Sequence, residues 1–189
     1  MIKKINKYTY AHGTRYMDNG SRNYDVAGQR LPSVTTILGR TKDDTYLRKW
    51  IAQKGKEEAE RIKTQSAVRG TSMHKYLENY VLGKGYEDLT ELGQTTKRMA
   101  QKVIEVGLAP VSGFYGSEVT LYYPGLYAGS TDLVGIHNDK ETIIDFKQAN
   151  RPKREEWIGD YKLQAGAYAM AHDYVHGSNI EQCVIMVCT

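Results

Sequence analysis

The sequence predicts an α/β (α+β) fold with a central mixed β-sheet flanked by helices and a helical N-terminal half. Apolar residues recur at helical spacing through much of 43–107, and strand-forming residues dominate 115–147. A strand–helix–strand order then follows over 142–188. The 189 residues are most simply one domain, with a small β unit at 1–31, a mainly helical part at 32–110 and a sheet with its helix at 111–189.

Composition is that of a globular protein, with 40% hydrophobic and 25% charged residues. The net charge of +4 allows a nucleic-acid partner without requiring one. Cys183 and Cys188 would point to opposite faces of a strand, so we expect no disulfide and a reduced, cytoplasmic protein. No apolar run reaches the length of a membrane span, and no signal-peptide pattern is visible, so no membrane partner is expected.

The N-terminal part suggests short strands at Tyr8–Tyr10 and Asn23–Val26, separated by a turn at Met17–Ser21. Ser33 can cap a helix that begins directly after it. Hydroxyl groups at a helix N-terminus suit a phosphate, and the hydroxyl-bearing residues here are Ser33, Thr35 and Thr36. A simple capped helix is an equally good interpretation of these residues.

Residues 43–83 are expected to be mostly helical, with a break or bend at Gly55. Gly70 is expected to end one helix, and Thr71 or Ser72 to start the next. His74 and Glu78 would share one side of that helix. A lone histidine is more often structural, so His74 becomes a functional candidate only if its helix packs beside the acidic hairpin described below. A third helix is expected over 91–107.

Three strands are expected to form a meander in the second half of the chain. Tyr115 to Tyr123 alternates as a strand and carries Glu118. Tyr127 to Ile136 and Glu141 to Lys147 form a hairpin around the polar tetrad His137-Asn138-Asp139-Lys140. Glu118 could reach a site on the hairpin, or it could be an exposed acid.

The register of this hairpin brings two acids together. If Asn138 and Asp139 form a two-residue loop, Asp132 lies opposite Asp145, with Cβ atoms roughly 5 Å apart. Lys147 then shares their face. Two opposed carboxylates repel each other, whereas a divalent cation between them would favour the pair. The alternative is that both acids face solvent on an edge hairpin.

The C-terminal part begins with a basic loop over Asn150–Trp157, which is either solvated or a clamp for a nucleic-acid backbone through Arg151, Lys153 and Arg154. A helix over Trp157–Val175 places Gln164 and Tyr168 on one side. Ile180–Thr189 is expected to be a buried strand, parallel to the second hairpin strand.

Five segments in this order resemble the RecB-like branch of the PD-(D/E)xK nucleases. They are Arg69–Glu78, Ser117–Val119, Gly129–Asp132, Ile144–Lys147 and Gln164–Tyr168. Leu31–Thr35 and the Trp50 helix are similar to phage exonucleases and the mitochondrial genome maintenance exonucleases in particular. The resemblance implies a restriction-endonuclease-like core over roughly residues 22 to 188. The chain departs from the pattern at Thr131, where proline is usual, and at Asp145, where glutamate is usual.

The resemblance also implies roles for individual residues. Metal ligands would be His74, Asp132, Asp145 and the carbonyl of Phe146, holding one or two Mg²⁺ or Mn²⁺ ions. Lys147 would orient or activate the attacking water, and Glu118 would be a supporting acid. Residues expected at the DNA are Gln164, Tyr168, Arg69, the 33–36 hydroxyls and the basic loop. Two cysteines are too few for the iron–sulfur cluster of some members. Similar proteins often continue into a further strand and helix.

The expected function is therefore a metal-dependent exonuclease acting on single-stranded DNA or DNA ends, in phage DNA recombination, replication or degradation. If the chain is phage-encoded, it would act in the host cytoplasm. A structure-specific endonuclease on the same core is a second possibility. A nucleic-acid-binding module without catalysis is a third, and the intact Asp132, Asp145 and Lys147 argue against it.

Overall fold

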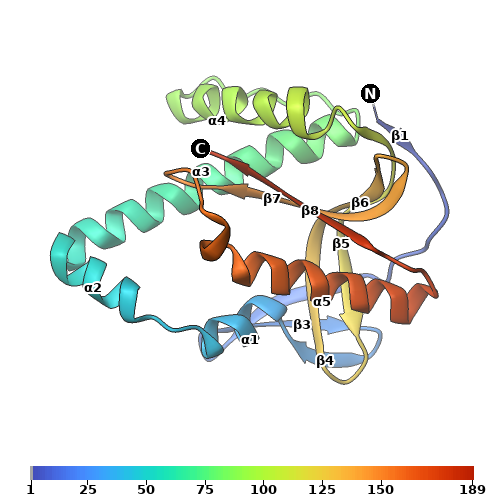
Figure 1. The fold of residues 1–189 in the computed structure, drawn as a ribbon, viewed down its shortest axis with the longest axis horizontal. Helices are drawn as coiled ribbons and strands as arrows, with labels where there is room; N and C mark the ends of the chain where they lie inside the picture. Colours follow the sequence, from blue (N-terminus) through green and yellow to red (C-terminus); the bar gives the residue numbers. More distant parts are fainter. Residues whose placement is uncertain (1) are drawn as a thin grey trace.

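A computed structural model describes residues 2–189 and contains a five-stranded mixed sheet at its centre (Figure 1). Its strand order is β1-β5-β6-β7-β8. The strands are Lys3–Lys4, Val111–Tyr123, Tyr127–His137, Lys140–Gln148 and Gln182–Cys188. β5, β6 and β7 form an antiparallel meander, and β1 and β8 are added in parallel at the two edges. The predicted mixed sheet and the parallel closing strand are confirmed.

Helices cover both faces of this sheet (Figure 1). The α-helices α1 to α5 are Val34–Thr41, Thr45–Lys54, Lys56–Val81, Glu91–Lys102 and Gly159–His176. A π-helical turn, η1 (Val103–Gly107), follows α4, and a 3₁₀ turn, η2 (Glu155–Trp157), precedes α5. Gly55 separates α2 from α3 with a backbone φ of 82°, as predicted. The Ser33 side chain accepts a hydrogen bond from the Thr36 N–H, which confirms it as the N-cap of α1.

The helix break predicted at Gly70 is wrong, because α3 runs without interruption from Lys56 to Val81. A glycine inside a helix costs about 1 kcal/mol relative to alanine. The turns after Gly70 carry Met73, Leu77 and Val81, which are at most 2% exposed. Burying one such side chain contributes about 1.5–3 kcal/mol, so the packing of this half outweighs the glycine.

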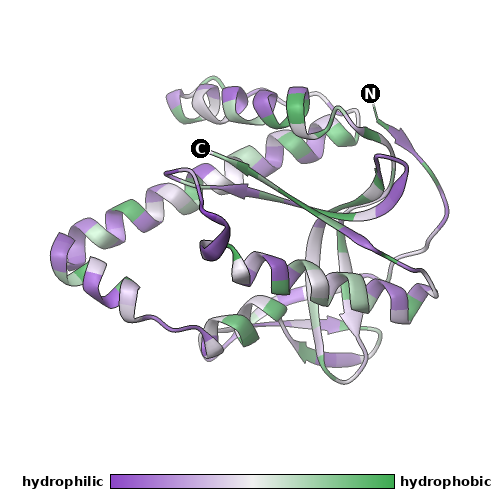
Figure 2. Ribbon diagram, in the orientation of Figure 1, coloured by the Kyte–Doolittle hydropathy of each residue, from purple (hydrophilic) through white to green (hydrophobic). Residues whose placement is uncertain are grey.

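Two hydrophobic cores lie on opposite faces of the sheet. The first joins α3 and η1 to Leu133, Ile144 and Phe146, and the second joins α1 and α5 to Val134 and Ile143. Adjacent strand residues thus alternate between the two cores, as the pleat of a strand requires. In Figure 2 hydrophilic colours mark much of α2, and no residue of this helix is buried.

A second sheet of three strands, the small sheet, packs beside the end of β6. It consists of β2 (Gly13–Asp18), β3 (Ser21–Val26) and β4 (Gln29–Pro32). Tyr24, Val26 and Leu31 of this sheet form a small core with Ala128 of β6. The predicted turn over Met17–Ser21 and the strand over Asn23–Val26 are confirmed.

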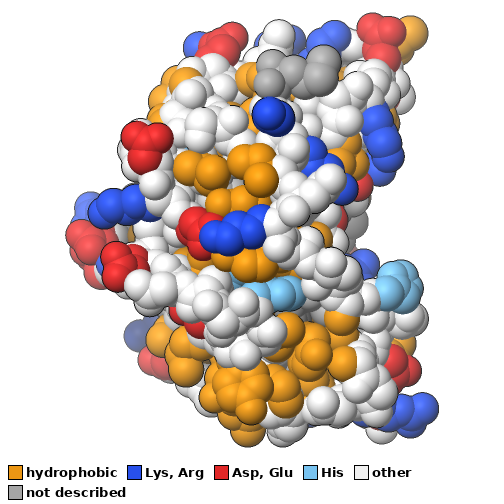
Figure 3. All heavy atoms as spheres, turned by 90° about the vertical axis from the view of Figure 1, so that its right-hand side faces the viewer, with side chains coloured by type: hydrophobic (Ala, Val, Ile, Leu, Met, Phe, Trp, Pro, Cys, Tyr) orange, Lys and Arg blue, Asp and Glu red, His pale blue; other side chains and the backbone are white. Residues whose placement is uncertain are grey.

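The strand predicted at Tyr8–Tyr10 is wrong, because these residues form no sheet pairing. Their rings pack against α5 instead: the ring centroid of Tyr8 lies 4.7 Å from that of His172, and Tyr10 Oη lies 3.1 Å from His172 Nε2. Tyr8 and Tyr115 both donate hydrogen bonds to Glu141. Figure 3 shows this side of the molecule, with two groups of hydrophobic side chains and histidine between them. Aromatic packing here replaces the expected backbone pairing.

The closing strand β8 is not buried as predicted, since only Met186 is buried within it and Cys183 and Val187 are exposed. The reason is its position at the edge of the sheet, where helices cover it only in part. Cys183 and Cys188 are free thiols. Among the described residues, no helix has the length and hydrophobicity needed to cross a membrane.

Candidate active site

The hairpin of β6 and β7 has the predicted register. His137 pairs with Lys140, and the ladder runs back to Leu133 opposite Ile144. Asn138 and Asp139 form the two-residue loop, with left-handed φ values of 49° and 62°. Extending this register places Asp132 opposite Asp145, on the sheet face that also carries Val134 and Ile143.

Asp132 is 9% exposed and uses both carboxylate oxygens. Oδ2 accepts a hydrogen bond of 2.5 Å from the backbone N–H of Phe146 in β7. Oδ1 lies 3.0 Å from Nδ1 of His74, which projects from α3. Asp132 therefore fixes the position of the histidine relative to the hairpin, and α3 does pack beside the acidic hairpin as a functional His74 requires.

Glu118 completes a group of three possible ligands with His74 and Asp132. One ligand atom from each residue lies within 4.8 Å of the other two. Glu118 adopts a left-handed backbone conformation, with φ of 53°, in the middle of β5. Such a conformation costs about 1–3 kcal/mol in a residue with a side chain and is found most often at functional sites. Desolvation and the charge of Asp132 raise the pKa of Glu118 to about 7.

Asp145 and Lys147 form an ion pair, with 2.5 Å between Oδ2 and Nζ. Asp145 is 4% exposed, and among the described residues its Oδ2 has no hydrogen-bond partner apart from this contact. Burial raises the pKa of Asp145 to about 6, with the charge of Asp132 adding to the rise and Lys147 opposing it. The Lys147 ammonium also lies 5.3 Å from the ring centroid of Tyr161.

The acids around His74 change its protonation. Burial alone lowers the pKa of this imidazole, but the hydrogen bond to Asp132 and the charges of Asp132 and Glu118 raise it above its usual value. Three carboxylates and a basic imidazole in one place are costly without a cation. Carboxylate and imidazole groups are also metal ligands in proteins, so the residues present fit a divalent ion.

α5 supplies the side of the site that faces the hairpin. Gln164 Nε2 donates a hydrogen bond of 3.1 Å to the Tyr168 hydroxyl, as their helical spacing suggested. Tyr168 is 3% exposed, and burial raises its pKa. The packing of Tyr168 requires glycine at position 129 of β6. A Cβ there would lie 2.6 Å from the Tyr168 ring, so only glycine lets the tyrosine pack on this strand.

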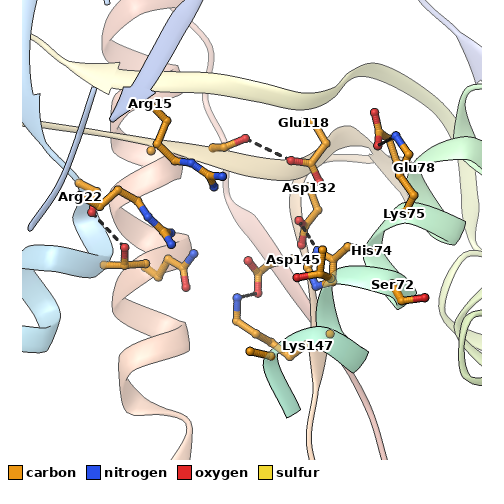
Figure 4. A pocket seen from close by; sticks show the side chains of 18 of the residues that line it. Arg15, Arg22, Ser72, His74, Lys75, Glu78, Glu118, Asp132, Asp145 and Lys147 are labelled. Carbon is orange, nitrogen blue, oxygen red and sulfur yellow. Dashed lines mark hydrogen bonds and ion pairs between the residues drawn. The ribbon is translucent and has the colours of Figure 1, made fainter. Parts of the chain in front are cut away.

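A cavity of about 1040 Å³ brings most of the predicted site residues together. They come from α1, α3, α5 and the sheet, and Figure 4 shows the labelled ones converging from several elements. The predicted residues that line the cavity are Ser33, Thr35, His74, Glu118, Asp132, Asp145, Lys147, Gln164 and Tyr168.

Other predicted residues lie outside the cavity lining. Phe146 meets the site through its backbone N–H, and the Thr36 hydroxyl is hydrogen-bonded to the backbone of Arg22. Arg69 is directed to Asn150, with Nη2 donating to the Asn150 side chain. The exposed basic loop holds Arg151, Lys153 and Arg154, and Arg154 stacks over Trp157 at 5.2 Å.

The lining residues that sequence reasoning missed include Arg15, Arg22, Tyr24 and Tyr161. The first three belong to the small sheet, whose position relative to the hairpin depends on contacts between distant parts of the chain. No local pattern marks them. Tyr161 could have been found from helical spacing, because it precedes Gln164 by three residues and so shares its side of α5.

Comparison with curated proteins identifies distant relatives. The chain is 28% identical over 190 residues to mitochondrial genome maintenance exonuclease 1 of Mus musculus, covering 93% of this chain and 55% of the relative. It is 26% identical over 180 residues to the protein of the same name from Xenopus tropicalis, covering 88% and 50%. The chain thus spans about half the length of the curated relatives it matches. No protein-family model matches.

Proposed function

We propose that this protein is a metal-dependent DNA exonuclease of the PD-(D/E)xK, RecB-like type that hydrolyses phosphodiester bonds. The observation that carries the proposal is the His74–Glu118–Asp132 group beside the Asp145–Lys147 pair, in a cavity of about 1040 Å³. The names of the two relatives support the same activity.

His74, Asp132, Asp145 and the Phe146 carbonyl are the proposed ligands of Mg²⁺ or Mn²⁺. The position of Glu118 adds it to this set as a further ligand or as a supporting acid. If the proton of the neutral imidazole is on Nδ1, it is donated to Asp132 and Nε2 is left free to bind the ion. A bound ion would act as a Lewis acid that lowers the pKa of water and offsets charge on the scissile phosphate.

Side chains around the proposed metal site position the water and the nucleotide in this proposal. Lys147 positions the attacking water and stabilises the charge that develops on the phosphate, while Asp145 holds its ammonium in place. Gln164 and Tyr168 orient the nucleotide from α5. The products would be a 5′-phosphate and a 3′-hydroxyl.

The substrate is proposed to be single-stranded DNA or DNA with free ends. The test is cleavage of end-labelled linear single-stranded DNA beside a closed single-stranded circle, with Mg²⁺, Mn²⁺ or EDTA. Short products from the linear strand with the circle intact are expected. Cutting of the circle would favour the endonuclease, and binding without cleavage of either would favour a non-catalytic module.

Lys147→Ala is expected to reduce cleavage at least 100-fold while DNA binding persists, because the ammonium acts on the developing charge. Lys140→Ala is the matched control, since Lys140 is an exposed lysine of the same strand, beside the hairpin loop. Equal activity of the two variants would remove Lys147 from the mechanism.

The biological setting belongs to the proposal as well. Free thiols at Cys183 and Cys188 are compatible with a reducing cytoplasm, that of the host if the chain is phage-encoded. Recombination, replication or degradation of phage DNA would each use an exonuclease. The two relatives are named as mitochondrial proteins.

A further inference from the structure

Two arginines of the small sheet, Arg15 on β2 and Arg22 on β3, line the same cavity as the acidic group formed by Glu118, Asp132 and Asp145. Arg15 pairs with Tyr24 and Arg22 with Met17 across the two strands. Directly paired residues share a face and residues two apart share it too, so both arginines lie on the face that carries Tyr24. Figure 4 shows both side chains extending from this sheet toward the side where Asp132, Asp145 and Lys147 lie.

Neither guanidinium has an acidic partner in the part of the chain that the structure describes. The ion pairs of arginine there involve Arg30, Arg48, Arg61 and Arg154. An unpaired arginine is common on a protein surface, but two that converge on one cavity beside a candidate metal site form a concentrated positive charge. Guanidinium groups bind phosphate with two parallel hydrogen bonds, which fixes both its position and its orientation.

The backbone of Arg22 is held in place by the first turn of α1. Its carbonyl accepts a hydrogen bond of 2.9 Å from the Ser33 N–H and another of 3.0 Å from the Thr36 hydroxyl. Its N–H donates to the same Thr36 hydroxyl at 3.0 Å, and Ser33 Oγ donates to that oxygen at 2.9 Å. Two of the three hydroxyl-bearing residues expected to touch phosphate, Ser33 and Thr36, are thus used to position Arg22.

We propose that Arg15 and Arg22 hold a non-scissile backbone phosphate of the nucleic-acid strand, with Thr36 as the positioning residue for Arg22. This inference rests on the proposed function, because it places the strand between the small sheet and the acidic group. A phosphate held there fixes the register of the strand at the site without reading its sequence. The site would take single strands of any base composition.

Binding is measured with a fluorescently labelled single-stranded oligonucleotide in EDTA, so that cleavage cannot interfere. Arg22→Gln and Arg15→Gln are each expected to weaken binding roughly tenfold and to flatten the slope of log K against log salt by about 0.7. Arg30→Gln is the control, because Arg30 lies in the same small sheet on the other face and pairs with Asp25. The proposal would be overturned if Arg22→Gln and Arg30→Gln bound the oligonucleotide with the same affinity and the same salt slope.

A neutral methylphosphonate placed at one linkage at a time locates the phosphate. One linkage is expected at which neutralisation weakens binding by the wild-type protein but not by Arg22→Gln. An equal loss for both proteins at every linkage would show that Arg22 contacts no particular phosphate. Thr36→Val is expected to give part of the Arg22→Gln loss, and Thr36→Ser, which keeps the hydroxyl, to restore it; no loss with Thr36→Val would remove its positioning role.

These outcomes are distinct from failure of the proposed function. If the wild-type protein cleaves no DNA with any metal but loses affinity on Arg22→Gln, the phosphate clamp stands and the nuclease does not. If cleavage occurs and the arginine variants bind like Arg30→Gln, the nuclease stands and the clamp does not.

Discussion

Asp145→Asn is expected to stabilise the metal-free protein at neutral and alkaline pH while it abolishes nuclease activity. Asp145 is 4% exposed, and burial with the nearby charge of Asp132 raises its pKa from 3.8 to about 6. Its ionised form is therefore disfavoured in the folded state even with Lys147 beside it. Asparagine has nearly the same shape and carries no charge, so it removes that penalty.

The magnitude follows from the shift in pKa. A rise from 3.8 to about 6 corresponds to about 3 kcal/mol, at about 1.36 kcal/mol per unit. Because the pKa is higher in the folded state, the folded protein keeps this proton longer, and stability falls as pH rises from about 4 to above 6. The asparagine variant should match the wild type near pH 4 and exceed it by up to about 3 kcal/mol at pH 8, which is about 6–12 °C in Tm.

The assay is thermal or urea denaturation in EDTA between pH 4 and pH 8. Asp139→Asn is the control, because Asp139 is an exposed acid in the loop of the same hairpin and its left-handed conformation suits asparagine equally well. Adding Mn²⁺ should stabilise the wild type more than Asp145→Asn, since a bound ion favours the ionised carboxylate. A stability difference that does not change with pH would refute the reasoning.

Two further predictions concern the ligand set and the basic loop. His74→Ala should raise the Mn²⁺ concentration needed for half-maximal activity at least tenfold, because the imidazole is a proposed ligand of the ion. The change in Tm should be small, because the imidazole is partly exposed. An unchanged Mn²⁺ titration would remove His74 from the proposed ligands. Reversing the charges of Lys153 and Arg154 to glutamate should weaken DNA binding and flatten its salt dependence. If the salt slope stays the same, the loop is simply solvated.

The hairpin could be predicted in detail because its determinants are local. The polar tetrad at 137–140 fixes the loop, the loop fixes the register, and the register brings Asp132 opposite Asp145. The pairing of Gln164 with Tyr168 likewise follows from the period of a single helix. In each case the sequence separation is short or is counted along one regular element.

What could not be predicted depends on packing between distant elements. Tyr8 and Tyr10 have strand-forming character, but His172 on α5 provides an aromatic surface that the local sequence does not reveal. Arg15 and Arg22 look like ordinary exposed residues until the small sheet is placed beside the cavity. Glu118 was expected as a supporting acid, but its left-handed backbone and its proximity to His74 appear only in three dimensions.

The error at Gly70 shows how the site depends on the core. His74 lies one residue after Met73 and three before Leu77, both of which are fully buried under the sheet. If α3 ended at Gly70, a loop would have to aim His74 at Asp132. Because α3 continues, the packing of Met73 and Leu77 holds the imidazole 3.0 Å from the Asp132 carboxylate, whose other oxygen is bound to the backbone of β7. Asp132 thereby joins α3 to the hairpin. The half of α3 whose buried side chains offset the cost of Gly70 is also the half that carries His74, the candidate ligand.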